Sequence, residues 1–540
     1  MKAAPRFDLT WILVLLLAVP AVAPLTYPGF FETQGGFLTA LNAAHPAEAP
    51  NWGWTADPVR GEGKLPYLLA WPFFQLSGSG VTAVKWGYGL AFLLAAAGAY
   101  FWTRRWLGPK GGLLAAVVYT YLPWHLSAVY VRGAYAEAWL WALWPVILWA
   151  ADGLAGRRRW ASALVGLLAL GAAFWIQAGL TAVFAVGLLI ALASSLTSLR
   201  RISRLGWIVL LALAVAIIYL GARSPQPSVD FAGHFVYPFQ LLSAAWGFGS
   251  SVPDWADGLS FQLGLAAVGL SVMAVILKAA QRPAEVVACA TAPESLEESG
   301  KTEKGSASWG RAFWAWVVAL AAIVLLVLPL AAPVWRVTGL DELLTYPWQL
   351  LALAGLPLAF LAGSAIRVDR RLGELPAWAG VTALVILASY PYLVPRFTRV
   401  DPGAEPLGVV QPVGTAAPQI LLLDAQVAPL PPVAEITPTL AVTLTWQATE
   451  PVTGDYTVFV HLLGPDGSKV AQQDARPCDG ACPTDAWQPG VVVTDRHTLD
   501  LEAGALPGPY RLAIGLYLLD SGERAVVVGR DDDTVFIDVP

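Results

Sequence analysis

Charged residues are scarce in this chain: Asp, Glu, Lys and Arg make up 13% of its 540 residues, whereas hydrophobic residues make up 56%. An ordinary soluble domain carries roughly 25% charged residues. The composition therefore excludes a typical soluble protein and indicates that a lipid bilayer is the main solvent of the chain.

The motifs of the common soluble enzyme classes are also missing. The sequence contains no Walker loop, dinucleotide fingerprint, nucleophile elbow or zinc motif with proper ligand spacing. Its five histidines are too scattered to predict a metal site. Residues 401–540 hold 19 acidic against six basic side chains, a net charge of −13, so we expect no nucleic-acid partner.

Only three cysteines are present, and two of them lie close together. Cys478 and Cys482 flank a Gly-containing turn in which a small disulfide loop is feasible. Two cysteines cannot complete a tetrahedral zinc site, so the pattern favours a disulfide, with free thiols as the alternative. A disulfide implies an oxidising, extracytoplasmic compartment.

Long apolar runs dominate the first 395 residues, and short Arg-rich segments separate them. Runs of about 20 apolar residues can cross a bilayer as helices. The sequence predicts an all-α membrane bundle of about eleven spans. They are expected at residues 10–27, 81–103, 111–129, 135–154, 160–177, 180–198, 205–222, 260–281, 312–333, 347–366 and 375–394.

The basic segments set the expected orientation of this bundle. With the N terminus inside the cell, the Arg-rich connections all fall on the cytoplasmic side, and the odd number of spans places the C terminus outside. Residues 28–80 then form the first outer loop, and the polar residues 282–311 form a disordered cytoplasmic loop. The first apolar segment is expected to be a retained anchor, with a cleavable signal peptide as the alternative.

Residues 396–540 have a different character. Period-two apolar runs separated by turn signals, such as residues 464–467 (GPDG), predict seven or eight short strands and hence an all-β sandwich. Four aromatic residues of this domain are expected to fill its core, with a sugar-stacking platform as the alternative. These residues are Trp446, Tyr456, Trp487 and Tyr517.

Charged side chains near the predicted outer surface are the candidates for chemistry. Charge at the end of a span is costly unless it is paired, exposed to water or used. Arg132 and Glu137 bracket the outer end of one span, and we expect them to share a water-filled cavity with the first outer loop. The charged candidates of that loop are Glu32, Asp57, Arg60, Glu62 and Lys64.

Four segments of the helical part resemble those of a bacterial membrane protein family labelled pyruvoyl-tetrahydropterin-synthase-related. The resemblance covers about residues 8–395. The segments are residues 130–137 (YVRGAYAE), 246–251 (WGFGSS), 257–264 (DGLSFQLG) and 346–351 (YPWQLL).

That family in turn resembles the GT-C class of integral-membrane glycosyltransferases. The resemblance implies transfer of a sugar from a polyprenyl-phosphate carrier at the outer face, for cell-envelope glycan assembly. It also implies a base in the first outer loop and cationic help for the departing phosphate from Arg side chains or from a divalent ion. Arg132 and Arg60 are the candidates for this help; the alternatives are a structural pair of Arg132 with Glu137 and a solvated loop charge for Arg60. Trp246, Asp257 and Tyr346 are expected at the rim of the site. The C-terminal sandwich resembles a domain appended to such transferases.

The chain departs from the family pattern where the base is expected. Relatives carry Thr-His-Asp-Gly followed by a His, whereas Gly35 and Thr39 occupy the Asp and later His positions here. Glycine can neither accept a proton nor bind a metal. Glu32, Asp57 and Glu62 are therefore the candidate bases. The alternative is a non-catalytic protein of the same fold that binds a lipid-linked glycan or a partner protein; a transporter is a weaker third hypothesis, because no internal repeat is found.

Overall fold

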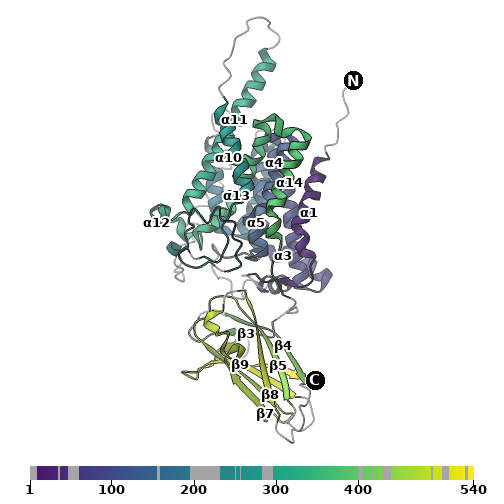
Figure 1. The fold of residues 1–540 in the computed structure, drawn as a ribbon, viewed down its shortest axis with the longest axis vertical. Coiled ribbons are helices and arrows are strands. Elements are labelled where there is room, and N and C mark those ends of the chain that lie inside the picture. The colour runs from purple at the N-terminus through teal and green to yellow at the C-terminus, as the bar shows by residue number, and fades with distance from the viewer. Residues whose placement is uncertain are drawn as a thin grey trace.

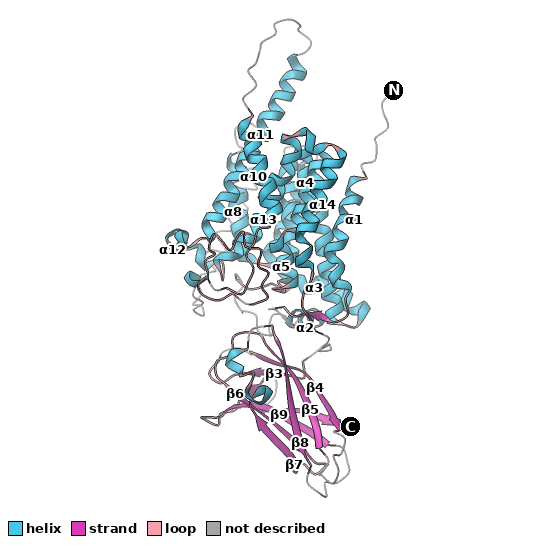
Figure 2. Ribbon diagram, viewed as in Figure 1, coloured by secondary structure: helices cyan, strands magenta, loops and turns pink. Residues whose placement is uncertain are grey.

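A helical bundle and a region of antiparallel sheet make up the two parts of the chain in this computed structural model (Figures 1 and 2). The structure describes residues 9–33, 37–46, 60–154, 159–194, 231–249, 251–255, 257–281, 296–398, 406–415, 419–429, 439–487, 490–501, 510–528 and 533–539.

The longer helices of the bundle follow the apolar runs of the sequence. They are α1 (Thr10–Val22), α2 (Leu38–Ala44), α3 (Leu65–Ser77), α4 (Gly80–Tyr121), α5 (Pro123–Tyr130), α6 (Tyr135–Gly153), α7 (Arg159–Ile176), α8 (Ala178–Ser194), α10 (Leu265–Ala280), α11 (Leu296–Val327), α12 (Ala332–Thr338), α13 (Leu351–Val368) and α14 (Leu375–Ser389).

Five helices among the described residues are long and apolar enough to cross a membrane. They are Gly80–Tyr121, Arg159–Ile176, Trp309–Val327, Pro347–Val368 and Leu375–Leu393. Thr10–Thr26, Ala178–Ile190 and Leu265–Ala280 are shorter apolar helices. A membrane protein with several helical spans is thus supported, but the expected number of eleven is not confirmed. The expected span 205–222 lies outside the described residues.

Helix α4 contains a reversal of the chain. Gly108 has φ 72° and ψ 177°, a conformation that favours glycine, and Pro109 follows it. The second half of α4 ends at the extended residue Leu122, which precedes Pro123. The expected span 111–129 is therefore divided between α4 and α5, and this break shapes the end of the bundle that carries Arg132.

One expectation for the connections is wrong. Residues 282–295 lie outside the described ranges, but residues 296–311 belong to α11 and do not form an irregular loop. Eight of its 16 residues are Leu, Glu, Lys, Ala or Arg, which are good helix formers, and a helix can extend beyond the apolar run that predicts a span.

Two antiparallel sheets form the C-terminal part, with strand orders β10-β3-β4-β5-β8 and β11-β9-β6-β7. The strands are β3 (Gly408–Gln411), β4 (Ile420–Pro429), β5 (Thr439–Ala448), β6 (Tyr456–Leu463), β7 (Lys469–Ala475), β8 (Val492–Asp500), β9 (Tyr510–Leu518), β10 (Val526–Val527) and β11 (Val535–Val539). Side chains of both sheets share one hydrophobic core, as in a sandwich. Trp446, Tyr456 and Trp487 are buried in it, so the core interpretation of these three aromatics is confirmed.

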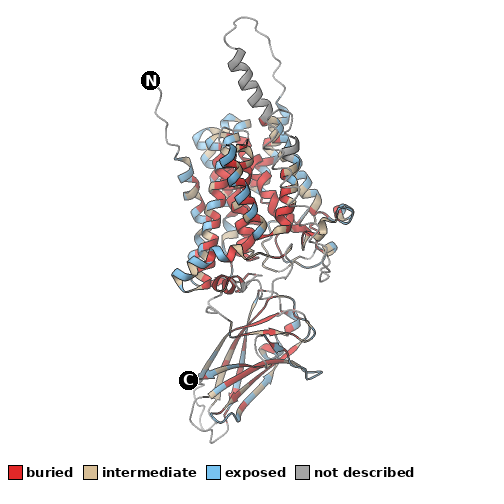
Figure 3. Cartoon of the chain, turned by 180° about the vertical axis from the view of Figure 1, so that it is seen from behind, coloured by how far each residue is buried: buried red, intermediate tan, exposed pale blue. Residues whose placement is uncertain are grey.

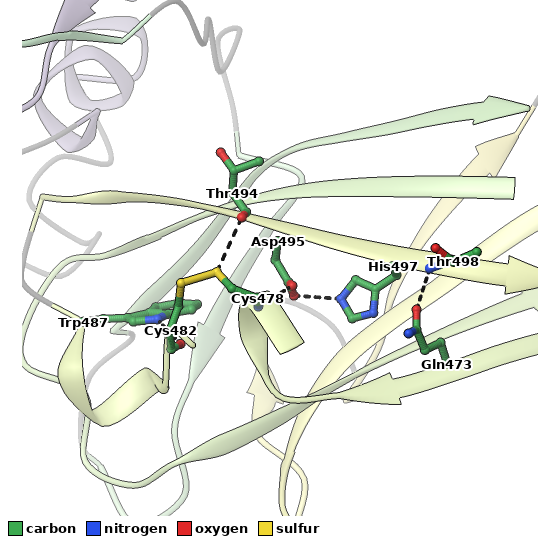
Figure 4. A network of polar contacts seen from close by, with 8 residues as sticks. All are labelled: Gln473, Cys478, Cys482, Trp487, Thr494, Asp495, His497 and Thr498. Carbon is green, nitrogen blue, oxygen red and sulfur yellow. Dashed lines mark hydrogen bonds and ion pairs between the residues drawn. A yellow bond between two sulfur atoms is a disulfide. The ribbon is translucent and has the colours of Figure 1, made fainter. Parts of the chain in front are cut away.

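A disulfide-closed loop is fixed to this core by buried polar groups (Figure 4). Cys478 is bonded to Cys482. The Cys478 amide donates to Asp495 Oδ1 at 2.8 Å, and Asp495 Oδ2 lies 2.7 Å from His497 Nε2. Asp495 and His497 are each 1% exposed. The hydrogen bond from the Cys478 amide therefore attaches the disulfide-closed loop to a buried polar pair of β8.

The sheet part is attached to the first outer loop through several contacts. β1 (Phe30–Phe31) pairs with β2 (Phe397–Thr398), which follows the last helix. The Phe37 amide at the start of α2 donates to Gln447 Oε1 at 3.1 Å. Leu421 of β4 packs in the hydrophobic core of the bundle. The sheets therefore lie at the end of the bundle to which the first loop belongs (Figure 1).

Close packing of α13 against α4 and α6 generates a stability prediction. The interior of the bundle is buried (Figure 3), and a Cβ at Gly355 would lie 2.4 Å from the Trp141 ring. We expect Gly355→Val to destabilise the protein by about 1–3 kcal/mol through overpacking. Gly380→Val in α14 is the matched control, because nothing lies within 4 Å of a Cβ there. Thermal unfolding in detergent measures both, and equal melting temperatures would contradict the packing described.

Candidate functional site

A buried ion pair lies in the turn between α5 and α6. Arg132 Nη1 donates to Glu137 Oε2 at 2.8 Å, and Nη2 donates to Oε1 at 2.6 Å. The two residues are 6% and 4% exposed. Gly133, with φ 65°, supplies the left-handed conformation that lets the chain turn between them. This two-pronged geometry is the one in which a guanidinium binds a carboxylate most strongly.

Aromatic rings enclose the cation of this pair. The Arg132 guanidinium lies 4.4 Å from the ring centroid of Trp124 and 5.4 Å from that of Trp348. Trp141 Nε1 contacts Glu137 Oε1 at 3.4 Å on the other side. Both ends of the pair thus have partners. Of the three Arg132 side-chain nitrogens, Nε alone has no hydrogen-bond partner within the described residues.

Glu62, from the first outer loop, lies beside the ion pair. Tyr67 of α3 donates its hydroxyl to Glu62 Oε2 at 2.8 Å. Desolvation by burial raises the pKa of the Glu62 carboxyl to about 7, partly offset by the hydrogen bonds from Tyr67 and from the Ala136 amide. The charge of Glu137 adds to this increase, and that of Arg132 opposes it. A carboxyl that titrates near neutral pH can act as a general base or acid.

Polar aromatic side chains from three helices form the wall behind Glu62. Tyr67 interacts with the Asn42 side chain of α2, and its ring lies 5.9 Å from that of Tyr135 in α6. The Tyr88 ring of α4 lies 4.9 Å from the Tyr135 ring. Asn42 Oδ1 and the Tyr88 hydroxyl are buried without a hydrogen-bond partner within the described part of the chain. Sequence reasoning missed these residues, because their relation to Glu62 arises only from helix packing.

A second polar cluster connects the ion pair to the segment between residues 231 and 264, which precedes α10. Trp348, which covers Arg132, donates from Nε1 to Ser251 Oγ at 3.1 Å. Ser251 Oγ donates to Asp257 Oδ2 at 3.0 Å and lies 2.8 Å from His234 Nδ1. Desolvation raises the pKa of Asp257 to about 6. The Tyr346 ring stacks on Trp348 with centroids 4.9 Å apart.

The structure thus brings together some of the residues expected at one site. Asp257 and Tyr346 connect with Arg132 through Trp348, whereas Trp246 packs against Tyr392 with ring centroids 4.6 Å apart. The residues that form the candidate site are Glu62, Tyr67, Arg132, Glu137, Trp348, Ser251 and Asp257.

The other expected residues have different positions or are not described. Arg60 donates to the backbone carbonyls of Asp341 and Glu342, so it links the start of the segment before α3 to the segment between α12 and α13. The Glu32 amide donates to Arg396 O beside the short β1–β2 pairing. Asp57 and Gly35 lie outside the described residues. Within the described ranges, no group of three or more His, Cys, Asp or Glu side chains could hold a metal ion.

Comparison with known proteins gives one match. Residues 63–249 match the family model of the 6-pyruvoyl-tetrahydropterin synthase related domain, whose description is membrane protein. The matched segment includes Arg132, Glu137 and Trp246 and begins one residue after Glu62. No curated protein and no solved structure matches the chain. The match supports membrane localisation, and its description names no glycosyl transfer.

The burial of the ion pair predicts a large effect of removing one charge. We expect Glu137→Gln to destabilise the protein by about 3–5 kcal/mol, because it leaves the Arg132 charge buried without its counterion. Asp538→Asn, which breaks the exposed Arg511–Asp538 pair, should cost at most about 1 kcal/mol. Unfolding in detergent monitored by circular dichroism measures the two effects.

A double variant tests the cause of that loss. Arg132→Met combined with Glu137→Gln removes both charges and should recover most of the stability lost in Glu137→Gln alone. A double variant no more stable than the single one would show that the buried charge is not the source of the loss.

Proposed function

We propose that this chain is a GT-C-like membrane glycosyltransferase, or a descendant of one. It takes a sugar from a polyprenyl-phosphate carrier at the outer face of a bacterial plasma membrane and transfers it to a glycan or protein acceptor of the cell envelope. The observation that carries the proposal is the position of Glu62, whose carboxyl has a pKa of about 7 beside the Arg132–Glu137 pair.

The reaction requires a base at this position. An acceptor hydroxyl loses its proton as it attacks the anomeric carbon, and Glu62 accepts that proton. The Tyr67 hydroxyl donates to this carboxyl and stabilises its ionised form. Glu62 therefore takes the role that the resemblance assigns to an Asp at the position of Gly35.

The orientation of the site agrees with this role. The Cys478–Cys482 disulfide of the sheet part is typical of an oxidising compartment, which supports an extracytoplasmic position of the sheets. The Phe37 amide donates to Gln447 Oε1, so the sheets contact the segment of residues 28–80 to which Glu62 also belongs, and this contact supports an outer position for Glu62.

A second candidate function is a non-catalytic protein that binds a lipid-linked glycan or a partner protein. The observation that favours it concerns the departing phosphate, which needs a cation in the transition state. Arg132 already binds Glu137 with both Nη atoms, and Arg60 binds two backbone carbonyls. Transfer therefore depends on a divalent ion or on the opening of one of these contacts.

The test of the base is sugar transfer from a polyprenyl-phosphate donor in proteoliposomes that contain the full chain. Glu62→Gln cannot accept a proton, so we expect a 10²- to 10⁴-fold loss of rate. Glu374→Gln, the same change at an exposed position preceding α14, is the control and should retain the rate of the wild type. Full activity of Glu62→Gln would refute the assignment, and absence of transfer by wild type with bound donor would favour the second candidate.

The pKa of Glu62 predicts the pH dependence of transfer. The base acts when it is ionised, so the rate of transfer should rise with pH and reach half its maximum near pH 7. Below pH 7 the rate should decrease, because Glu62 becomes protonated. Tyr67→Phe removes a hydrogen bond that lowers this pKa, so the midpoint should move to higher pH while the maximal rate is largely kept. A pH profile unchanged in Tyr67→Phe would contradict the proposed role of this hydrogen bond.

A further inference from the structure

Two cations and a buried indole meet at the end of the bundle remote from the sheets. Lys278 lies in the last turn of α10, Arg367 lies in the last turn of α13, and Trp309 belongs to α11. The ends of α10 and α13 are joined by a hydrogen bond from Gln281 Nε2 to the Val368 carbonyl at 3.1 Å. Figure 1 shows α10, α11 and α13 side by side in this part of the bundle.

Both cations lie against the same ring. Lys278 Nζ is 4.9 Å and the Arg367 guanidinium carbon is 4.5 Å from the ring centroid of Trp309. The ring attracts each cation, but it does not neutralise their charge. Among the ion pairs of the described residues, none involves Lys278 or Arg367. Their hydrogen-bond acceptors are neutral: the Gln281 side chain and the Trp106 carbonyl.

The indole N–H of Trp309 adds a third donor. Trp309 is 6% exposed, and its Nε1 is buried with no hydrogen-bond partner in the described structure. Two other tryptophans at this end of the bundle differ in this respect: Trp106 Nε1 donates to Asp152, and Trp378 Nε1 donates to the Lys110 carbonyl. Within the part of the chain that the structure describes, the Trp309 cluster therefore combines two positive charges that have no acidic partner with a donor that has no acceptor.

We propose that Lys278, Trp309 and Arg367 bind the phosphate of an anionic phospholipid at the membrane surface remote from the sheets. All three groups are donors, so they fit an acceptor with several oxygens and a negative charge. They lie at the ends of membrane helices, the depth at which lipid headgroups are found. Basic residues between helices at this depth form pockets for anionic headgroups. The site is separate from Glu62, so the proposal goes beyond the proposed function.

The experiment measures lipid binding to the full chain by native mass spectrometry, with phosphatidylglycerol compared with phosphatidylcholine. We expect the wild type to bind phosphatidylglycerol in preference to phosphatidylcholine. Lys278→Gln and Arg367→Gln should each weaken the binding of phosphatidylglycerol roughly fivefold, since one basic residue at a membrane surface contributes about that factor. Trp309→Phe keeps the ring and removes only the N–H, and it should weaken binding several-fold.

The control variant is Arg371→Gln, which removes one positive charge from an exposed residue just beyond α13. It should bind phosphatidylglycerol as the wild type does. An equal loss in Arg371→Gln and Lys278→Gln would overturn the proposal in favour of diffuse attraction. Competition by inorganic phosphate as strong as that by the lipid would show a general anion site and overturn the assignment to a phospholipid. Unchanged helical circular dichroism excludes unfolding as the cause of a loss.

Discussion

The Arg132–Glu137 pair is the interaction on which the geometry of the candidate site depends. Two opposite charges that are 6% and 4% exposed must satisfy each other, because burial of a single unpaired charge is too costly. Their two-pronged contact fixes the turn between α5 and α6. It also places the guanidinium between Trp124 and Trp348. Trp348 connects the pair to Ser251 by a hydrogen bond, and the charges of the pair affect the pKa of Glu62.

The sheet part is connected to the candidate site through contacts with α2. Gln447 of β5 accepts a hydrogen bond from Phe37 at the start of α2, and Gln447 is 1% exposed. Helix α2 carries Asn42, which contacts Tyr67, the hydrogen-bond partner of Glu62. A chain of contacts therefore runs from a β-strand to the acidic side chain. Rearrangement of the sheets relative to the first loop would change the surroundings of Glu62.

Apolar runs and period-two patterns in the sequence predicted a helical membrane part followed by a β-sheet part, because hydrophobic periodicity is a local property. The pairing of Arg132 with Glu137 was also within reach, since the residues are five positions apart and charge at a span end needs a partner. Asn42 and Tyr88 were missed, because their positions result from packing of distant segments. Helix at residues 296–311 was missed for another reason: polar composition does not exclude helix when good helix formers are frequent.

The charges of the candidate site restrict where a phosphate can be held in the proposed reaction. Arg132 and Glu137 neutralise each other, so ionised Glu62 adds a negative charge beside the pair that the pair does not compensate. A phosphate placed directly beside Glu62 would raise its pKa further and keep the base protonated. The group nearest Glu62 must therefore be a neutral hydroxyl, and the carrier phosphate must lie farther away. This separation is the arrangement that attack on the anomeric carbon requires, because the attacking hydroxyl and the departing phosphate occupy opposite sides of that carbon.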